Sequence, residues 1–307
     1  MAKKIKDPGL GNASSLNAKR MMNSSGAFNI QYVNKSARFS EAYHYLVNIS
    51  WLQFFVLTFA VGFFINSVFA IIYLVIGIEE IIPTTGSIAH DFLNAFFFSM
   101  QTFTTLGYGS MSPGGIASGI VSSIEAFIGL MLFAFATGLI YGRFSKPKAA
   151  VRFSKHIVLR DFNKNRALMF RLVNNRKTTM IRPKIAVTLS LTIKNSLGNY
   201  ENNFYTLKLE RDTISYLPTT WTIVHELDEE SPLFNFSNEE IIKMHGEFII
   251  MISYYDESFN QEVHQMHSYV LSDALSDFKF KKAYYYNDNG KLVLDYKLFD
   301  AVESFKS

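Results

Sequence analysis

One long stretch without positive charge constrains the fold of this chain more than any other feature. Residues 39–142 contain no Lys or Arg, although the 307-residue chain has thirty of them. Two apolar runs, residues 51–78 and 115–142, lie within this stretch. A helix over either run reaches roughly 40 Å, which is enough to cross the hydrocarbon core of a bilayer. The sequence therefore predicts a membrane protein with two spanning helices.

The charges around the two runs predict their orientation. Basic residues precede the first run and follow the second, whereas the loop between them carries only the acids Glu79, Glu80 and Asp91. Because cytoplasmic loops are enriched in Lys and Arg, we expect both termini in the cytoplasm and the connecting loop outside. Neither run is rich in Arg, so a voltage sensor is not expected.

The segments beside the spans have different patterns. Residues 38–50 place apolar side chains on one helical face, which predicts an interfacial helix on the inner leaflet; a cytosolic helix packed on protein is the alternative. After residue 146, short runs of β-branched and aromatic residues separated by Asn, Gly and Pro predict an all-β sandwich. These runs cover residues 186–193, 204–209, 221–227, 247–255 and 291–298. The predicted organisation is an N-terminal cytoplasmic segment (1–37), the interfacial helix (38–50), a two-helix pore domain (51–145) and a cytoplasmic β-domain (146–307).

The loop between the spans carries the motif with the clearest chemistry. A short apolar helix after Asp91 runs into Thr105-Leu106-Gly107-Tyr108-Gly109. A potassium ion entering a pore exchanges its water for oxygen ligands, and rings of backbone carbonyls can supply them. Successive carbonyls line one side only if alternate residues adopt left-handed backbone angles, which Gly107 and Gly109 allow. We therefore predict a selectivity filter at residues 105–109, with potassium held at Thr105, Leu106, Gly107 and Tyr108.

A filter of this kind needs four chains, so a homotetramer around one pore is expected. In the second span, Gly129 and Gly138 are each predicted either as hinges of a gate or as packing sites. Tyr141 is a candidate for the cytoplasmic constriction, or an interfacial anchor. Glu125 is the one acid inside a span, which makes it a functional candidate; a structural role behind the filter is the favoured alternative.

With the filter between two spans, the chain resembles inward-rectifier potassium channels. Further similar stretches are 19–33 (KRMMNSSGAFNIQYV), 143–148 (RFSKPK), 171–177 (RLVNNRK) and 222–233 (TIVHELDEESPL). The resemblance implies a membrane α-helical two-span pore domain plus an all-β immunoglobulin-like cytoplasmic domain that tetramerises to continue the pore. It also implies an N-terminal strand over 19–33.

The resemblance further assigns two groups of residues to function. It implies that anionic membrane phospholipids bind at the basic exit of the second span, and that a loop of the β-domain narrows the cytoplasmic pore. The lipid residues are Arg143, Lys146 and Lys148, and the loop residues are Glu257, Ser258, Phe259 and Asn260.

Several positions depart from the family pattern. Gln101 and Met111 stand where many members have a Glu–Arg ion pair that braces the filter. Phe133 and Arg182 stand where strong rectifiers often have acids, so weak rectification is expected. No basic residue accompanies Trp51. The chain has no Cys, which suggests a prokaryotic member in the plasma (inner) membrane.

The leading hypothesis is thus a potassium-selective channel gated from the cytoplasmic side by lipid or another ligand, with potassium as permeant ion and no cofactor. The rival hypothesis is a membrane-anchored binding module with a closed or vestigial pore. An enzyme is not expected, because His264 and His267 have the spacing of a metal pair but lack a third ligand. Nucleic-acid binding is not expected either, because the basic residues follow the membrane border.

Overall fold

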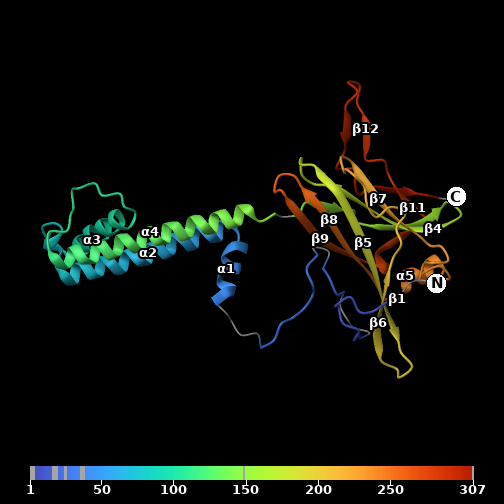
Figure 1. The fold of residues 1–307 in the computed structure, drawn as a ribbon, viewed down its shortest axis with the longest axis horizontal. Coiled ribbons are helices and arrows are strands. Elements are labelled where there is room, and N and C mark those ends of the chain that lie inside the picture. The colour runs from blue at the N-terminus through green and yellow to red at the C-terminus, as the bar shows by residue number, and fades with distance from the viewer. Residues whose placement is uncertain (1–3, 16–19, 24–25, 35–38, 148, 306–307) are drawn as a thin grey trace. The chain divides into compact units, whose positions relative to one another are not determined.

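The computed structural model describes residues 4–15, 20–23, 26–34, 39–147 and 149–305. The chain forms two compact units. The helical unit comprises Asn34–Lys146, and the β-domain comprises Met1–Val33 with Pro147–Ser307. Figure 1 shows the elements of each unit.

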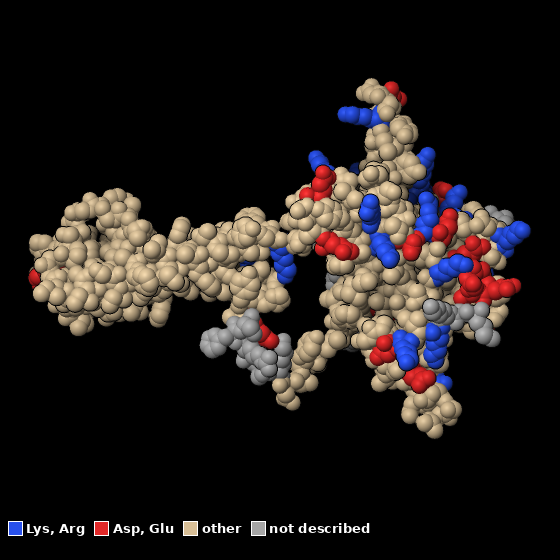
Figure 2. Space-filling view, viewed as in Figure 1, with Lys and Arg blue, Asp and Glu red and all other residues tan. Residues whose placement is uncertain are grey.

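The helical unit is built from four α-helices and one short 3-10 helix. These are α1 (Phe39–Asn48), α2 (Trp51–Ile76), η1 (Ile78–Glu80), α3 (Ile88–Phe103) and α4 (Ile116–Ser145). By length and composition, α2 and α4 are both suited to cross a membrane. Charged side chains gather on the β-domain in Figure 2, while the helical unit is almost entirely tan on this face. An apolar surface of this kind suits contact with lipid.

Local hydrogen bonds set the helix ends in this unit. Ser50 and Gln53 form a capping box at the start of α2, which satisfies backbone N–H groups that the first turn leaves free. The carboxylate of Glu80 accepts a hydrogen bond from the Ser118 backbone N–H (3.1 Å) in the first turn of α4, where a negative charge is favourable. Asp91 ties α3 to the preceding loop by accepting from the hydroxyls of Thr84 (2.6 Å) and Thr85 (2.7 Å).

The β-domain is a sandwich of two sheets. One sheet has the strand order β1 (Lys4–Ile5), β6 (Tyr200–Thr206), β5 (Met180–Lys194), β8 (Gly246–Asp256), β9 (Gln261–Val270). The other has the order β10 (Ala274–Ser276), β3 (Ile157–Phe162), β4 (Asn165–Asn174), β2 (Val151–Phe153), and β7 (Thr220–Glu226) pairs with β4. The pairs within both sheets are antiparallel except β10 with β3. This confirms the all-β sandwich that the strand pattern predicts, in the immunoglobulin-like class that the resemblance implies.

The core of the β-domain lies between the two sheets. Along β5, Ile185, Val187 and Leu189 are buried in one cluster with Ile223 of β7 and Phe248 of β8. The spacing of two residues puts the apolar side chains of β5 on one face of its sheet. The alternation of apolar and polar side chains therefore both identifies the strand and determines which of its faces packs on the core.

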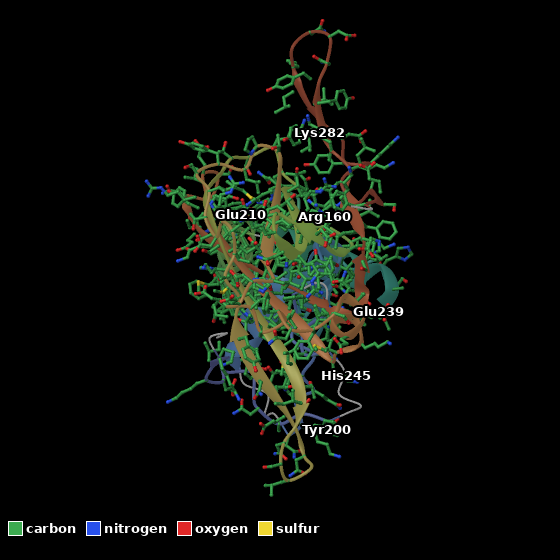
Figure 3. All side chains as sticks on the ribbon, turned by 90° about the vertical axis from the view of Figure 1, so that its right-hand side faces the viewer. Arg160, Tyr200, Glu210, Glu239, His245 and Lys282 are labelled. Carbon is green, nitrogen blue, oxygen red and sulfur yellow. The ribbon has the colours of Figure 1, made fainter. Side chains whose placement is uncertain are left out.

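Short elements complete the β-domain. They are α5 (Asn238–Lys243), η2 (Leu271–Asp273), and two two-stranded sheets, β11 (Phe278–Phe280) with β14 (Val302–Ser304) and β12 (Tyr284–Tyr286) with β13 (Leu292–Leu294). In Figure 3, Lys282 lies at the base of the β12–β13 hairpin and Tyr200 lies on the hairpin of β5 and β6.

Two sequence expectations differ from the observed strands. The run 291–298 forms a strand only at Leu292–Leu294, because Asp295 then makes a turn: its backbone oxygen accepts from Leu298 N–H (3.2 Å) and its side chain from Lys297 N–H (2.8 Å). Within 19–33, the described residues show an isolated bridge between Met22 and Phe28 in place of a strand.

Candidate ion-conduction site

The segment predicted as a filter follows directly from the end of α3. Its backbone N–H groups remain tied to that helix, since Thr105 donates to Thr102 O (3.0 Å) and Leu106 to Gln101 O (2.8 Å). The φ angles are +58° at Thr105, +52° at Gly107 and +82° at Gly109. Left-handed backbone therefore recurs at every second residue. The sequence argument anticipated this for the two glycines but not for Thr105.

The end of α3 contributes to the electrostatics of this segment. Residues 105–109 begin at the C-terminal end of the helix, where the backbone carbonyls carry partial negative charge. Leu106 and Tyr108 are 54% and 73% exposed, so neither side chain is buried within the chain. Residues 105–109 thus offer backbone oxygens and contain no Asp, Glu, Lys or Arg side chain.

A buried polar network lies beside α3. Glu125 of α4 is fully buried and accepts a hydrogen bond from the Tyr73 hydroxyl of α2 (2.6 Å). Its other carboxyl oxygen contacts the Ser99 hydroxyl of α3. Ser99 also lies 3.0 Å from Asn66 Oδ1 of α2. Sequence reasoning singled out Glu125 but missed its two partners, Tyr73 and Ser99, and Asn66 beyond Ser99; all are unremarkable polar residues in apolar helices.

The position of the ion pair that the family resemblance implies is occupied differently. Gln101 supplies a backbone oxygen to Leu106. Met111 packs against the apolar cluster that contains Phe98 and Ile81. The contacts of Met111 are therefore apolar, and the hydrogen bonds that join α3 to α2 and α4 come from the network at Glu125.

The two candidate hinge glycines have different surroundings. Both lie inside the uninterrupted helix α4. A Cβ at Gly129 would sit 2.1 Å from the Phe103 carbonyl oxygen, whereas a Cβ at Gly138 would meet nothing within 4 Å. Gly129 is thus a packing site against the end of α3, and Gly138 has no such role within the chain. Tyr141, near the end of α4, is 74% exposed.

The predicted lipid residues are engaged with α1 and with the start of α2. Arg143 donates to the backbone oxygens of Leu46 (2.6 Å) and Ile49 (2.7 Å). Its guanidinium lies 4.5 Å from the ring centre of Trp51, a cation–π distance. Lys146 donates to the Asn48 side chain, and Lys148 lies outside the described residues.

The loop of residues 257–260 connects β8 to β9. Its backbone turns at Asn260, whose φ is +51°, and Ser258 N–H donates to the buried Asp256 side chain (3.0 Å). Arg176 stacks on Phe259 at 5.4 Å and lies 3.8 Å from the Asp256 carboxylate. Arg182 occupies a left-handed position, with φ +48°, where β5 shifts register against β8.

Two other polar groups of the β-domain are structural. His225, from the TIVHELDEESPL stretch, is buried between Lys208 O (2.7 Å) and Ser231 Oγ (2.9 Å). Burial lowers the pKa of His225 below its usual 6.5. Arg171 contacts the backbone oxygens of Lys281, Leu298 and Phe299. Burial lowers the pKa of Arg171 to about 10.

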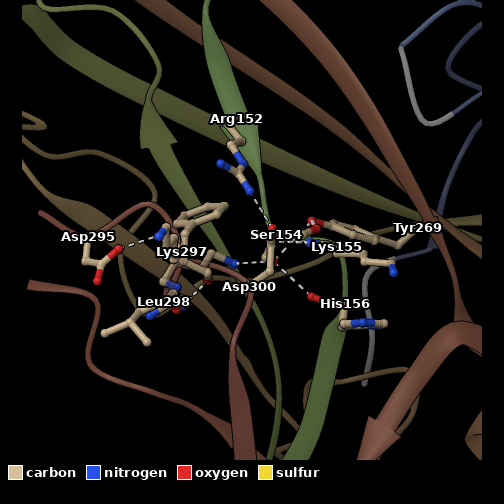
Figure 4. A network of polar contacts seen from close by, with 11 residues as sticks. Arg152, Ser154, Lys155, His156, Tyr269, Asp295, Lys297, Leu298 and Asp300 are labelled. Atoms are coloured by element: carbon tan, nitrogen blue, oxygen red, sulfur yellow. Dashed lines mark hydrogen bonds and ion pairs between the residues drawn. The ribbon is translucent and has the colours of Figure 1, made fainter.

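Arg171 and the nearby Arg152 bind the C-terminal segment, residues 278–304, to the sandwich. Figure 4 shows the adjoining contacts, in which the Asp300 carboxylate pairs with Arg152 (2.5 Å) and accepts from the Lys155 backbone N–H (2.9 Å). The segment is thus fixed to β2 and β4 by charge-assisted hydrogen bonds.

The histidine pair does not form a metal site. His264 and His267 are three residues apart on β9, so their side chains point to opposite faces of the sheet. His267 stacks on Phe153 with ring centres 4.4 Å apart. Within the described ranges, no cluster of three or more His, Cys, Asp or Glu side chains could hold a metal ion.

Two membrane-suited helices, with a short helix and a non-helical loop between them, define a pore-loop ion channel. A family model described as "Ion channel" matches residues 51–146, and one described as "Inward rectifier potassium channel C-terminal domain" matches residues 151–307. The chain belongs to the inward rectifier potassium channel family. It is therefore a membrane protein of potassium transport, a function without enzymatic chemistry.

Individual relatives agree with this membership. The chain is 32% identical to inward rectifier potassium channel Kirbac3.1 of Paramagnetospirillum magnetotacticum, over 92% of this chain and 95% of that protein. It is 27% identical to human inward rectifier potassium channel 4, over 68% of this chain and 49% of that protein. It is 28% identical to human ATP-sensitive inward rectifier potassium channel 10, over 69% of this chain and 58% of that protein. The similarity to a bacterial relative over nearly its whole length supports a prokaryotic-type member.

Proposed function

We propose that four copies of this chain form a potassium-selective channel whose filter is residues 105–109. Potassium is coordinated by backbone oxygens of Thr105, Leu106, Gly107 and Tyr108. The observation that carries this proposal is the left-handed backbone at every second residue of the segment, since that alternation lets successive carbonyls face one axis. No single chain surrounds an ion with such oxygens, so the homotetramer belongs to the same proposal.

Flux through purified channels in liposomes tests the filter. Wild-type protein is expected to pass rubidium and potassium much faster than sodium. Gly107→Ala is expected to abolish this flux, because a Cβ disfavours the left-handed angle by roughly 1–2 kcal/mol in each subunit. Gly62→Ala is the matched control, since neither glycine has an atom within 4 Å of an added Cβ. Equal sodium and potassium flux would exclude a selective filter, and a monomeric protein in membranes would exclude the ring.

The orientation and modules of the channel form a second part of the proposal. Both termini and the β-domain lie in the cytoplasm of a cell whose plasma (inner) membrane holds residues 51–145. Residues 38–50 lie on the inner leaflet, 1–37 form the N-terminal cytoplasmic segment, and 146–307 form the cytoplasmic domain. The basic flanks around an acidic connecting loop support this orientation. Labelling of single cysteines introduced at residues 85 and 290 by a membrane-impermeant reagent on intact cells measures it: only residue 85 should react.

Gating is proposed from the cytoplasmic side, with anionic phospholipid as a modulator at Arg143, Lys146 and Lys148. The α4 end carries Gly138 and Tyr141 as the hinge and constriction of this proposal, and the loop of Glu257, Ser258, Phe259 and Asn260 narrows the cytoplasmic pore. Neutralising Arg143, Lys146 and Lys148 to Gln is expected to change the flux response to increasing phosphatidylglycerol. A control with the exposed β-domain residues Lys194, Lys243 and Lys291 changed to Gln should respond as wild type does.

Weak rectification is the last element of the proposal. Phe133, an apolar residue that is 74% exposed in the single chain, offers no charge to a blocking cation. Phe133→Asp is expected to increase block by internal magnesium, because it would place four acids around the pore. Unchanged block would show that residue 133 does not face the permeation path.

A further inference from the structure

The network at Glu125 has three hydrogen-bond contacts, but its two hydroxyl groups carry only two hydrogens. Three contacts join four buried side chains: Tyr73 with Glu125, Ser99 with Glu125, and Ser99 with Asn66. All four residues are at most 4% exposed. They come from α2, α3 and α4, so the network joins the pore helix to both spanning helices.

Hydrogen counting assigns the missing donor. Asn66 Nδ2 donates to the Gly62 backbone oxygen at 2.7 Å, so Asn66 turns its acceptor oxygen toward Ser99. Tyr73 and Ser99 each bring one hydrogen, whereas an ionised carboxylate brings none. The three contacts need three hydrogens, and the carboxyl group of Glu125 is the remaining source. Turning the Asn66 amide over does not help, because Oδ1 would then face the Gly62 oxygen with no hydrogen between them.

The lack of positive charge around Glu125 also favours a protonated carboxyl group. Residues 39–142 contain no Lys or Arg, in this chain or in any other copy of it. Arg143 follows Glu125 by about 27 Å along α4 at the usual helical rise. Tyr73 is the titratable side chain that faces Glu125 from α2, and α3 presents the hydroxyl of Ser99. A buried carboxylate without a cation nearby is strongly unfavourable, so a proton on the carboxyl group is the stable alternative.

We infer that Glu125 is protonated and acts as a neutral hydrogen-bond donor that positions the pore helix. In this arrangement Glu125 donates to Ser99, Ser99 donates to Asn66, and Tyr73 donates to Glu125. Ser99 lies one helical turn before Phe103, where α3 ends and the filter segment follows. Glu125 thus does for α3 what a charged brace at residues 101 and 111 would do, without placing a charge beside the ions. The inference deepens the proposed filter and depends on it for its functional meaning.

Glu125→Gln separates this role from that of a charge. Gln has nearly the same shape, donates through its amide to Ser99 and accepts from Tyr73, as the protonated acid does. Potassium flux and selectivity of Glu125→Gln in liposomes should therefore stay within about twofold of wild type, since each hydrogen bond is kept. If Glu125 were ionised, the variant would remove four negative charges near the filter, and flux should fall about tenfold or more.

Infrared spectroscopy of the full-length protein in lipid detects directly whether the carboxyl group of Glu125 is protonated. The wild-type minus Glu125→Gln difference spectrum at neutral pH should contain the carbonyl stretch of a protonated carboxylic acid, shifted in D₂O. Glu79→Gln, which removes an exposed carboxylate in η1, should instead remove ionised-carboxylate bands.

Loss of ionised-carboxylate bands in Glu125→Gln would overturn the inference. Failure of Glu125→Gln to assemble would also count against it, because Gln reproduces every hydrogen bond assigned to the protonated acid. A protein that conducts no potassium would refute the proposed function, whereas the infrared band would still decide the proton on Glu125.

Discussion

The contrast between Gly129 and Gly138 yields a quantitative prediction about the pore. A Cβ at Gly129 would lie 2.1 Å from the Phe103 carbonyl oxygen, and ordinary contact begins near 3.4 Å. Gly129→Ala must therefore move α4 or the end of α3 by the difference of 1.3 Å. Such overpacking costs about 1–3 kcal/mol per subunit, and the better helix propensity of Ala offsets about 1 kcal/mol of it. Because Phe103 lies two residues before the proposed filter, selectivity should fall as well.

Gly138→Ala is the matched variant. It adds the same methyl group to the same helix where nothing lies within 4 Å, so it should keep or slightly raise stability. Thermal unfolding of both variants in detergent, followed by rubidium and sodium flux in liposomes, measures the difference. If Gly138 serves as a hinge, Gly138→Ala changes flux while leaving stability intact. Equal stability of the two variants would refute the packing role of Gly129.

Three further predictions concern the α1 contact and the β-domain. Arg143→Lys keeps the charge but loses one of the two hydrogen bonds to Leu46 and Ile49, so hydrogen exchange of α1 should accelerate while lipid response remains. Because burial keeps the pKa of His225 below 6.5, acidification below pH 6.5 protonates the unfolded chain first and lowers the free energy of unfolding of the β-domain; His225→Asn should lose this slope. Arg171→Met removes the guanidinium donor from the backbone oxygens of Lys281 and Phe299, while Leu298 O still accepts from the Ala301 N–H (3.2 Å); the change should cost about 2 kcal/mol or more, seen as faster hydrogen exchange in residues 278–304.

Each of these predictions has a result that contradicts it. Unchanged exchange of α1 in Arg143→Lys would mean that one hydrogen bond suffices to hold that helix. A pH slope that persists in His225→Asn would assign the acid sensitivity to other groups. Exchange in Arg171→Met that accelerates uniformly across the β-domain would show that Arg171 supports the whole sandwich and not its C-terminal segment.

Much of the architecture could be predicted because its causes are local in sequence. A helix in lipid satisfies its own backbone, so two long apolar runs without Lys or Arg suffice to indicate two spans. Strand alternation identified β5, β7 and β8 in the same way. The turn at Asp295 was missed, because the run 291–298 looks apolar enough for a strand while a side-chain hydrogen bond ends it after Leu294.

The backbone of residues 105–109 was also predictable only where its cause is local. Two glycines spaced by one residue after a short helix were enough to predict alternating left-handed backbone, because that property belongs to the residues themselves. Positive φ at Thr105 could not be predicted, since a non-glycine residue adopts it only when its surroundings impose it.

Sequence by itself thus determined the two membrane-suited helices, the left-handed backbone at Gly107 and Gly109, and the β-class of the second unit, through charge, hydropathy and glycine spacing. Tertiary structure alone decided which residues meet: Glu125 with Ser99 and Tyr73, Gly129 with Phe103, and Arg143 with the end of α1. Those partners are 26 to 97 positions apart along the chain. Nothing in a local pattern encodes such contacts, because packing of whole helices brings the side chains together.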